Sequence, residues 1–240
     1  MFQKFVRKFL LPAVGVSLLT AACAQAGPPA APPELSTGRN LYAIVTERDL
    51  PGFAPRAVVV GRFKAVVPEY EAVPGLRTKY FFISDRKTYG GVYLFTDRAS
   101  ADAYLESPLL AAISAKATGQ RTLTRFEIPL AIDGPAAGNP DLAKGKAVVR
   151  IVRITPPAGA PREAILAGFE QAAPAYSKAP GLVHKWFSIG EDGRFGGIYL
   201  FANKAAADAW FSPAWHSRVK ETYGVDGEVV ALDAPVVIEK

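Results

Sequence analysis

The residues from Pro74 to Phe95 read PGLRTKYFFISDRKTYGGVYLF, and those from Pro180 to Phe201 read PGLVHKWFSIGEDGRFGGIYLF. The two stretches lie 106 residues apart and align without a gap. Matches at the same offset continue on both sides, and a similarity of this length indicates an internal repeat. The order of elements in one copy therefore predicts the order in the other.

Both copies predict the same six elements. Strands are expected at residues 41–47, 76–84, 89–96 and 123–132 of the first copy, and at 147–153, 182–189, 195–202 and 229–238 of the second. One helix should begin near Pro55 and Pro161, since proline suits the first helical turn. A second helix should begin near Arg98 and Lys204. The order βαββαβ is typical of a ferredoxin-like fold.

One segment is ambiguous when it is read alone. Val58–Val60 has the β-branched composition of a strand. The aligned segment of the second copy, PREAILAGFEQAAPAYSK, has apolar residues at helical spacing. We therefore expect a helix at this place in both copies.

The alternation of the strand at residues 182–189 predicts how the copies assemble. One face should carry Val183, Lys185, Phe187 and Ile189, and the other Leu182, His184, Trp186 and Ser188. Both faces hold large apolar groups, although helices cover only one face of such a sheet. We expect an α+β fold in which two tandem ferredoxin-like repeats pack as an intramolecular, pseudo-dimeric α+β barrel, so that the protein is a monomer.

The sequence divides into five segments. Residues 1–26 have a basic start, an apolar run and an Ala-Gln-Ala cleavage site, which is typical of a secretory signal peptide. This predicts a periplasmic or secreted protein. A competing hypothesis is a lipobox ending at Cys23, which would make a membrane-anchored lipoprotein. The remaining segments are a Pro-rich tether (27–39), repeat one (40–132), a linker (133–145) and repeat two (146–240).

Charge and composition exclude several classes. The formal charge is +6, but residues 1–26 carry three basic and no acidic residues, which leaves 25 − 22, or +3. The sequence has no cluster of basic residues with interleaved aromatic residues, which is the pattern that would indicate nucleic-acid binding. Cys23 is the only cysteine, so disulfides and thiol catalysis are not expected after cleavage. The two histidines lack metal-ligand spacing, and no P-loop or dinucleotide motif occurs.

The repeated pattern resembles a known family, the YdhR-type monooxygenase-like proteins of the dimeric α+β barrel superfamily. The matching residues are Pro74, Gly75, Leu76, Lys79, Phe81, Gly90, Gly91, Tyr93, Leu94 and Phe95, with Pro180, Gly181, Leu182, Lys185, Phe187, Gly196, Gly197, Tyr199, Leu200 and Phe201 in repeat two. The resemblance implies a cofactor-independent monooxygenase that acts on a small aromatic or polyketide-like compound. Members are mostly single-domain and intracellular, whereas this chain is a tandem repeat behind an export signal.

The two repeats differ in aromatic and titratable residues. All three tryptophans and both histidines lie in repeat two. If the second helix packs on the face that carries His184 and Trp186, these groups can line one pocket. The predicted site has His184 as candidate proton acceptor and a ligand pocket of Trp186, Trp210, Trp215, His216 and Lys185.

Other interpretations stay open. The aromatic residues can instead belong to the core. Lys79 and Lys185 stand at equivalent positions, where lysines are usually solvated or snorkelling, although they can also steer an acidic ligand.

Three function classes follow: a monooxygenase-like enzyme, a non-catalytic exported binding protein for a small hydrophobic ligand, and a haem-binding barrel with His184 or His216 as axial ligand. Whether the protein is an enzyme stays open. No metal is expected, and no cofactor apart from the haem alternative.

Overall fold

The computed structural model describes residues 38–52, 54–117, 119, 121–138, 142 and 145–240. The predicted signal peptide, the lipobox cysteine Cys23 and residues 27–37 of the tether lie outside the described residues. The first strand begins at Gly38, two residues before the predicted start of repeat one. In the described ranges, no helix is long and apolar enough to cross a membrane.

Each repeat has the predicted order of elements. The second helical region is divided into two helices in both repeats, and the first is divided only in repeat one. Repeat one consists of β1 (Gly38–Asp49), α2 (Arg56–Ala65), α3 (Val67–Glu71), β2 (Leu76–Ile83), β3 (Thr88–Phe95), α4 (Arg98–Leu105), α5 (Pro108–Lys116) and β4 (Arg121–Asp133). Repeat two consists of β5 (Val148–Ile154), α6 (Arg162–Tyr176), β6 (Leu182–Gly190), β7 (Phe195–Phe201), α7 (Lys204–Trp210), α8 (Pro213–Tyr223) and β8 (Glu228–Glu239).

The ambiguous segment of repeat one is helical, as the alignment predicts. Val58–Val60 lies inside α2, which has Pro55 as its N-cap residue. The helix breaks at Val66 and resumes as α3, whereas α6 continues through the equivalent Ala172 and Ala173. Alanine favours a helix more than the β-branched valine does, which accounts for the difference.

The eight strands form one closed barrel in the order β1-β3-β2-β8-β5-β7-β6-β4. Within each repeat the strands are antiparallel, and two further antiparallel pairs, β2 with β8 and β4 with β6, join the repeats. The predicted pseudo-dimeric α+β barrel is confirmed. The two sheets do more than face one another, because hydrogen bonds continue across both seams and leave no free sheet edge.

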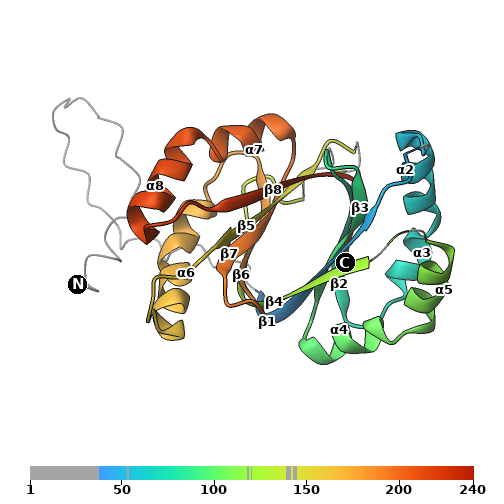
Figure 1. The fold of residues 1–240 in the computed structure, drawn as a ribbon, viewed down its shortest axis with the longest axis horizontal. Helices are drawn as coiled ribbons and strands as arrows, with labels where there is room; N and C mark the ends of the chain where they lie inside the picture. The colour runs from blue at the N-terminus through green and yellow to red at the C-terminus, as the bar shows by residue number, and fades with distance from the viewer. Residues whose placement is uncertain (1–37, 53, 118, 120, 139–141, 143–144) are drawn as a thin grey trace, which may run out of the picture.

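The helices lie outside the barrel in two groups (Figure 1). Helices α2–α5 cover the strands of repeat one, and α6–α8 cover those of repeat two. Three apolar clusters result: one inside the barrel, and one between sheet and helices in each repeat. The strands β2, β3, β6 and β7 are therefore buried on both faces along most of their length, which explains why their sequences are apolar on both.

Candidate functional site

A buried lysine lies between the sheet and the helices of repeat two. Lys185 on β6 is 1% exposed. Its Nζ lies 3.7 Å from the ring centroid of Tyr199, 4.4 Å from that of Phe187 and 5.0 Å from that of Tyr176. Nζ also donates a hydrogen bond of 3.3 Å to the carbonyl oxygen of Gly196. We call these four side chains the lysine cage of repeat two.

The Gly-Gly pair of β7 makes room for this lysine. A Cβ atom at position 197 would overlap Nζ of Lys185 and lie 2.8 Å from the carbonyl oxygen of Trp186. A Cβ atom at position 196 would overlap the backbone of Val152 on β5. The first glycine thus permits close strand approach, and the second permits the lysine to lie across the sheet.

The cage favours an uncharged amine. Burial lowers the pKa of Lys185 well below its ordinary value. No described carboxylate pairs with it to oppose this effect. Burial also raises the pKa of Tyr199 and of Tyr176, whose hydroxyl accepts a hydrogen bond of 3.4 Å from the Tyr199 hydroxyl. Burial therefore favours the uncharged form of the amine and of both phenols.

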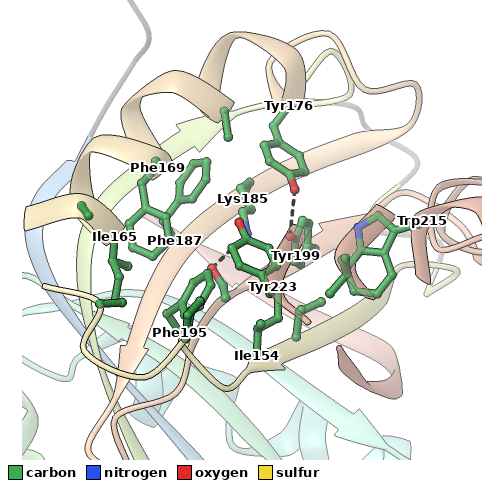
Figure 2. Close-up of a pocket in the computed structure, with 18 residues that line it drawn as sticks. Ile154, Ile165, Phe169, Tyr176, Lys185, Phe187, Phe195, Tyr199, Trp215 and Tyr223 are labelled. Atoms are coloured by element: carbon green, nitrogen blue, oxygen red, sulfur yellow. Dashed lines mark hydrogen bonds between the residues drawn. The ribbon is translucent and has the colours of Figure 1, made fainter. Parts of the chain in front are cut away.

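A cavity of about 50 Å³ adjoins the cage (Figure 2). Its walls come from the cage, from α6 and from α8, which contributes Trp215, Val219 and Tyr223. Figure 2 shows the hydroxyls of Tyr176 and Tyr199 pointing toward each other beside Lys185. A water molecule needs roughly 10–15 Å³ of cavity volume measured in the same way, so this cavity has room for a few waters.

Repeat one holds a matching cage. Nζ of Lys79, also 1% exposed, lies 2.7 Å from the ring centroid of Tyr70, 3.8 Å from that of Phe81 and 4.5 Å from that of Tyr93. Each of these residues is 106 positions before its counterpart. Burial lowers the pKa of Lys79 too. Both lysines are thus buried, and the prediction of solvated or snorkelling side chains was wrong.

The space beside the cage in repeat two follows from small residues on α6. Ala164, Gly168 and Ala172 line the cavity. The residues 106 positions earlier are Val58, Arg62 and Val66, which are all larger. Repeat one also fills its cage with Tyr104, whose hydroxyl lies 3.1 Å from that of Tyr70, where repeat two has Trp210.

His184 lies away from this cavity, at the seam between the repeats. Its Nδ1 is 2.8 Å from a carboxylate oxygen of Asp133 on β4, and its Nε2 is 2.7 Å from one of Glu239 on β8. Burial by itself lowers the pKa of His184, but the hydrogen bonds and charges of the two carboxylates outweigh it and raise the pKa to about 9. The ring is therefore protonated at neutral pH, where both nitrogens donate and neither accepts a proton.

Trp186 lies inside the barrel, on the opposite side of the sheet from the helices. Its ring stacks on Tyr80, the equivalent residue of repeat one, with centroids 5.1 Å apart and planes at 17°. A β-bulge at residues 182–184 shifts the register of β6. As a result Val183 joins Trp186 in the barrel interior, while Lys185 faces the helices. The predicted grouping of Val183 with Lys185 was wrong.

The remaining predicted residues lie on the helical side. Trp215 is buried and lines the cavity with Lys185. Trp210 packs on Tyr176 with centroids 5.3 Å apart, and its buried Nε1 has no hydrogen-bond partner among the described residues. His216 meets the ring of Trp215 edge to face, and its Nδ1 lies 2.8 Å from a carboxylate oxygen of Asp226. The structure thus brings Lys185, Trp210 and Trp215 together, separates them from His184 and Trp186, and leaves His216 outside the cavity lining.

The histidines give no support for a haem site. Both ring nitrogens of His184 are occupied by carboxylates, and His216 does not line the cavity. The space beside the cage is also far smaller than a porphyrin. Among the described residues, no group of three or more His, Cys, Asp or Glu side chains could hold a metal ion.

Sequence reasoning missed the rings that form the cage. The repetition of Tyr70 and Tyr176, and of Tyr93 and Tyr199, at the same offset as the lysines was visible, but spacing alone did not show that they converge. Likewise, the change to small residues on α6 was visible in the alignment and predicts a cavity once the helix is known to lie over the sheet.

The fold and site define a class: an α+β barrel closed from two ferredoxin-like halves, with a small pocket between sheet and helices. A model of the family described as "Putative mono-oxygenase ydhR" matches residues 53–128 and 153–231. The chain belongs to this family, which occurs in it twice. The resemblance stated from the repeated motif is confirmed.

Solved structures share the whole barrel at low sequence identity. A monooxygenase-like protein of Fusobacterium nucleatum is 10% identical with a TM-score of 0.63, covering 84% of this chain and 95% of its own. One from Lactobacillus acidophilus is 12% identical with a TM-score of 0.59, covering 83% and 96%. A protein described as anthrone oxidase-like is 13% identical with a TM-score of 0.52, covering 83% and 93%. No curated protein sequence matches this chain significantly. These likenesses describe the fold.

Proposed function

We propose that this protein binds a small, electron-rich aromatic compound beside the lysine cage of repeat two and oxidises it with dioxygen without a cofactor. The observation that carries the proposal is the burial of the Lys185 amine among three aromatic rings at the edge of a cavity, which lowers the pKa of this lysine. Aromatic walls suit an aromatic ligand, and a neutral amine can accept a proton at neutral pH.

Lys185 is the proposed proton acceptor. Removal of a proton from an activated C–H or phenolic O–H group makes the ligand electron-rich enough to react with dioxygen. The resulting ammonium would lie 3.7 Å from the ring centroid of Tyr199 and 3.3 Å from the carbonyl oxygen of Gly196. Both contacts stabilise a cation, so the cage favours the protonated state more once a counter-charge has formed on the ligand.

The two tyrosine hydroxyls are the proposed hydrogen-bond donors to the ligand. Since their pKa values are raised, Tyr176 and Tyr199 stay protonated and can donate hydrogen bonds to an oxygen that gains negative charge. For a ligand whose CH₂ group is made acidic by conjugation with a carbonyl through an aromatic ring, as in anthrone, the net reaction converts CH₂ and O₂ to a carbonyl and water. One oxygen atom enters the product, and dioxygen is the only oxidant.

Binding of such a ligand requires the pocket to open. The cavity of about 50 Å³ has room for dioxygen or water, but not for an aromatic ring. The outer wall is α8, which starts after a break at Phe211–Ser212 and ends at Gly224 in the left-handed conformation. We propose that α8 moves outward with Trp215 and Tyr223 when a ligand enters.

Aerobic turnover of anthrone tests the proposal, since one structural relative is described as anthrone oxidase-like. We expect formation of anthraquinone, with a kcat that falls roughly 100-fold in Lys185→Met. The matched variant Lys79→Met removes the equivalent lysine of the more tightly filled cage and should keep most activity. Equal activity of wild type and Lys185→Met would rule out the proton transfer.

The alternative is a non-catalytic binding protein that uses the same pocket. Trp215 lines the pocket and so reports on its occupancy through tryptophan fluorescence. Saturable quenching by anthrone in the absence of oxygen, without anthraquinone when oxygen is admitted, would favour this alternative. The proposed location of either protein is the periplasm or the exterior, as the signal-like start of the chain indicates, with lipid anchoring through Cys23 as the competing case.

A further inference from the structure

A second and larger cavity lies at one end of the barrel interior. Its volume is about 190 Å³. The apolar floor includes Val45, Phe82 and Ile151, which belong to the barrel cluster. The charged groups at its mouth are Glu47, Arg86 and Arg153. A volume of roughly 150 Å³ is large enough for benzene, so this cavity, whose lining combines apolar and polar side chains, can hold a ring or a branched chain of similar size.

The cavity lies where the two repeats meet, and its lining shows what the tandem repeat permits. Val45 and Ile151 are 106 positions apart, as are Glu47 and Arg153. A barrel of two identical chains would place the same residue on both sides of its two-fold axis. In one continuous chain, an acidic residue on β1 faces the same cavity as a basic residue on β5.

Arg153 has an unsatisfied donor at this cavity. Its Nε is buried and has no hydrogen-bond partner among the described residues. Its ion pair with Glu228 is long, at 3.8 Å, while Arg194 holds the same carboxylate at 2.7 Å. The guanidinium carbon lies 5.9 Å from the ring centroid of Phe126, which helps to fix its orientation. A buried N–H donor such as this Nε is costly to leave without a hydrogen-bond partner, so an acceptor from outside the chain would stabilise it.

The neighbouring carboxylate is already engaged. Glu47 accepts a hydrogen bond of 3.3 Å from Arg86 and another from the hydroxyl of Thr88. These contacts hold Glu47 on the side of repeat one. Glu47 is therefore not available as a close counter-ion for the guanidinium of Arg153 inside the cavity.

We propose that this cavity is a binding site for a small monocarboxylate with an aromatic or branched aliphatic body. The carboxylate would pair with Arg153, since a guanidinium matches a planar carboxylate with two parallel hydrogen bonds. The apolar body would lie against Val45, Phe82 and Ile151. A doubly charged anion is disfavoured by Glu47 at the same mouth. The site is independent of the lysine cage, which lies on the other side of the sheet.

Benzoate is a suitable probe, with binding to the full chain measured by isothermal titration calorimetry. We expect saturable binding with one site, at least 10-fold weaker binding for Arg153→Met, and an intermediate affinity for Arg153→Lys. Benzamide, which has the same shape without the charge, should bind at least 10-fold more weakly than benzoate. Lys185→Met should leave benzoate affinity unchanged, which separates this site from the lysine cage.

Val230→Phe provides a second variant that fills the cavity without changing its charge, since Val230 lines it as well. Loss of benzoate binding in this variant, with an unfolding temperature close to that of wild type, supports the site. No binding to the wild type at about 10 mM benzoate would overturn the proposal. Equal affinities in wild type, Arg153→Met and Val230→Phe would overturn it too, because benzoate would then bind elsewhere.

Discussion

At the residue scale, two titratable groups in neighbouring positions of β6 have opposite environments. Lys185 faces aromatic rings and an uncharged backbone carbonyl, so burial lowers its pKa. His184 faces two carboxylates, which hold its pKa at about 9. The sequence His-Lys reads as two basic residues side by side, whereas the fold lowers the pKa of the lysine and raises that of the histidine.

His184 ties together the two seams of the barrel, and its charge state should therefore govern stability. Its folded pKa of about 9 exceeds the ordinary value of 6.5. The stabilisation is thus fully present below pH 6.5 and is lost as pH rises through about 9. We expect His184→Gln to lower the free energy of unfolding by about 2 kcal/mol at pH 7 and by much less at pH 10.

Denaturant unfolding between pH 6 and pH 10 measures this effect. His216→Gln is the matched control, since His216 is half-exposed and has a carboxylate partner on its own side of the barrel. A cost of His184→Gln that stays constant across this pH range would show that the histidine contributes packing rather than charge.

The lysine at equivalent positions of both repeats was visible in the sequence, but its burial was not. An isolated lysine on a strand usually has a solvated side chain. Burial here depends on the second glycine of the Gly-Gly pair and on rings from α6 and β7 as well as from β6 itself, which local spacing does not bring together. His184 was selected because histidine titrates near neutral pH, and only the fold reveals the carboxylates of Asp133 and Glu239 beside it.

At the scale of elements, the repeat allowed the order of helices and strands to be predicted. The same alignment corrected Val58–Val60 from strand to helix. The bulge in β6 was not predictable, because an alternating pattern assigns faces only when the register is unbroken. One extra residue moved Val183 to the barrel interior, whereas the opposite directions of Lys185 and Trp186 follow from ordinary alternation.

The helix α6 determines which repeat has a cavity. We expect the triple variant Ala164→Val, Gly168→Arg, Ala172→Val, which copies α2 into α6, to close the space beside Lys185. Repeat one accommodates the same side chains with only a local break of the helix at Val66, so the free energy of unfolding should change by no more than about 2 kcal/mol. Anthrone binding, followed by tryptophan fluorescence, should be lost.

The matched control is Val58→Ala, Arg62→Gly, Val66→Ala in repeat one. It should leave binding at repeat two unchanged while it enlarges the space near Lys79. Retained anthrone binding in the α6 variant would mean that the ligand site lies elsewhere.

At the scale of the whole molecule, the two seams make one cooperative unit. The pairs β2 with β8 and β4 with β6 close the barrel and leave no strand edge for a second chain. We therefore expect a monomer of the mature chain and a single unfolding transition. Light scattering coupled to size exclusion measures the mass, and a stable dimer would show that another surface drives assembly.

The proposed proton transfer requires an uncharged Lys185 beside an aromatic cavity. Carbon-13 NMR of lysine-labelled protein tests this directly, with the Cε resonance of Lys185 assigned by its loss in Lys185→Met. We predict that this resonance has the chemical shift of a neutral amine at pH 7, while surface lysines titrate near pH 10.4. A Lys185 resonance that titrates with the surface lysines would contradict the account, because the amine would then be charged at neutral pH and unable to accept a proton.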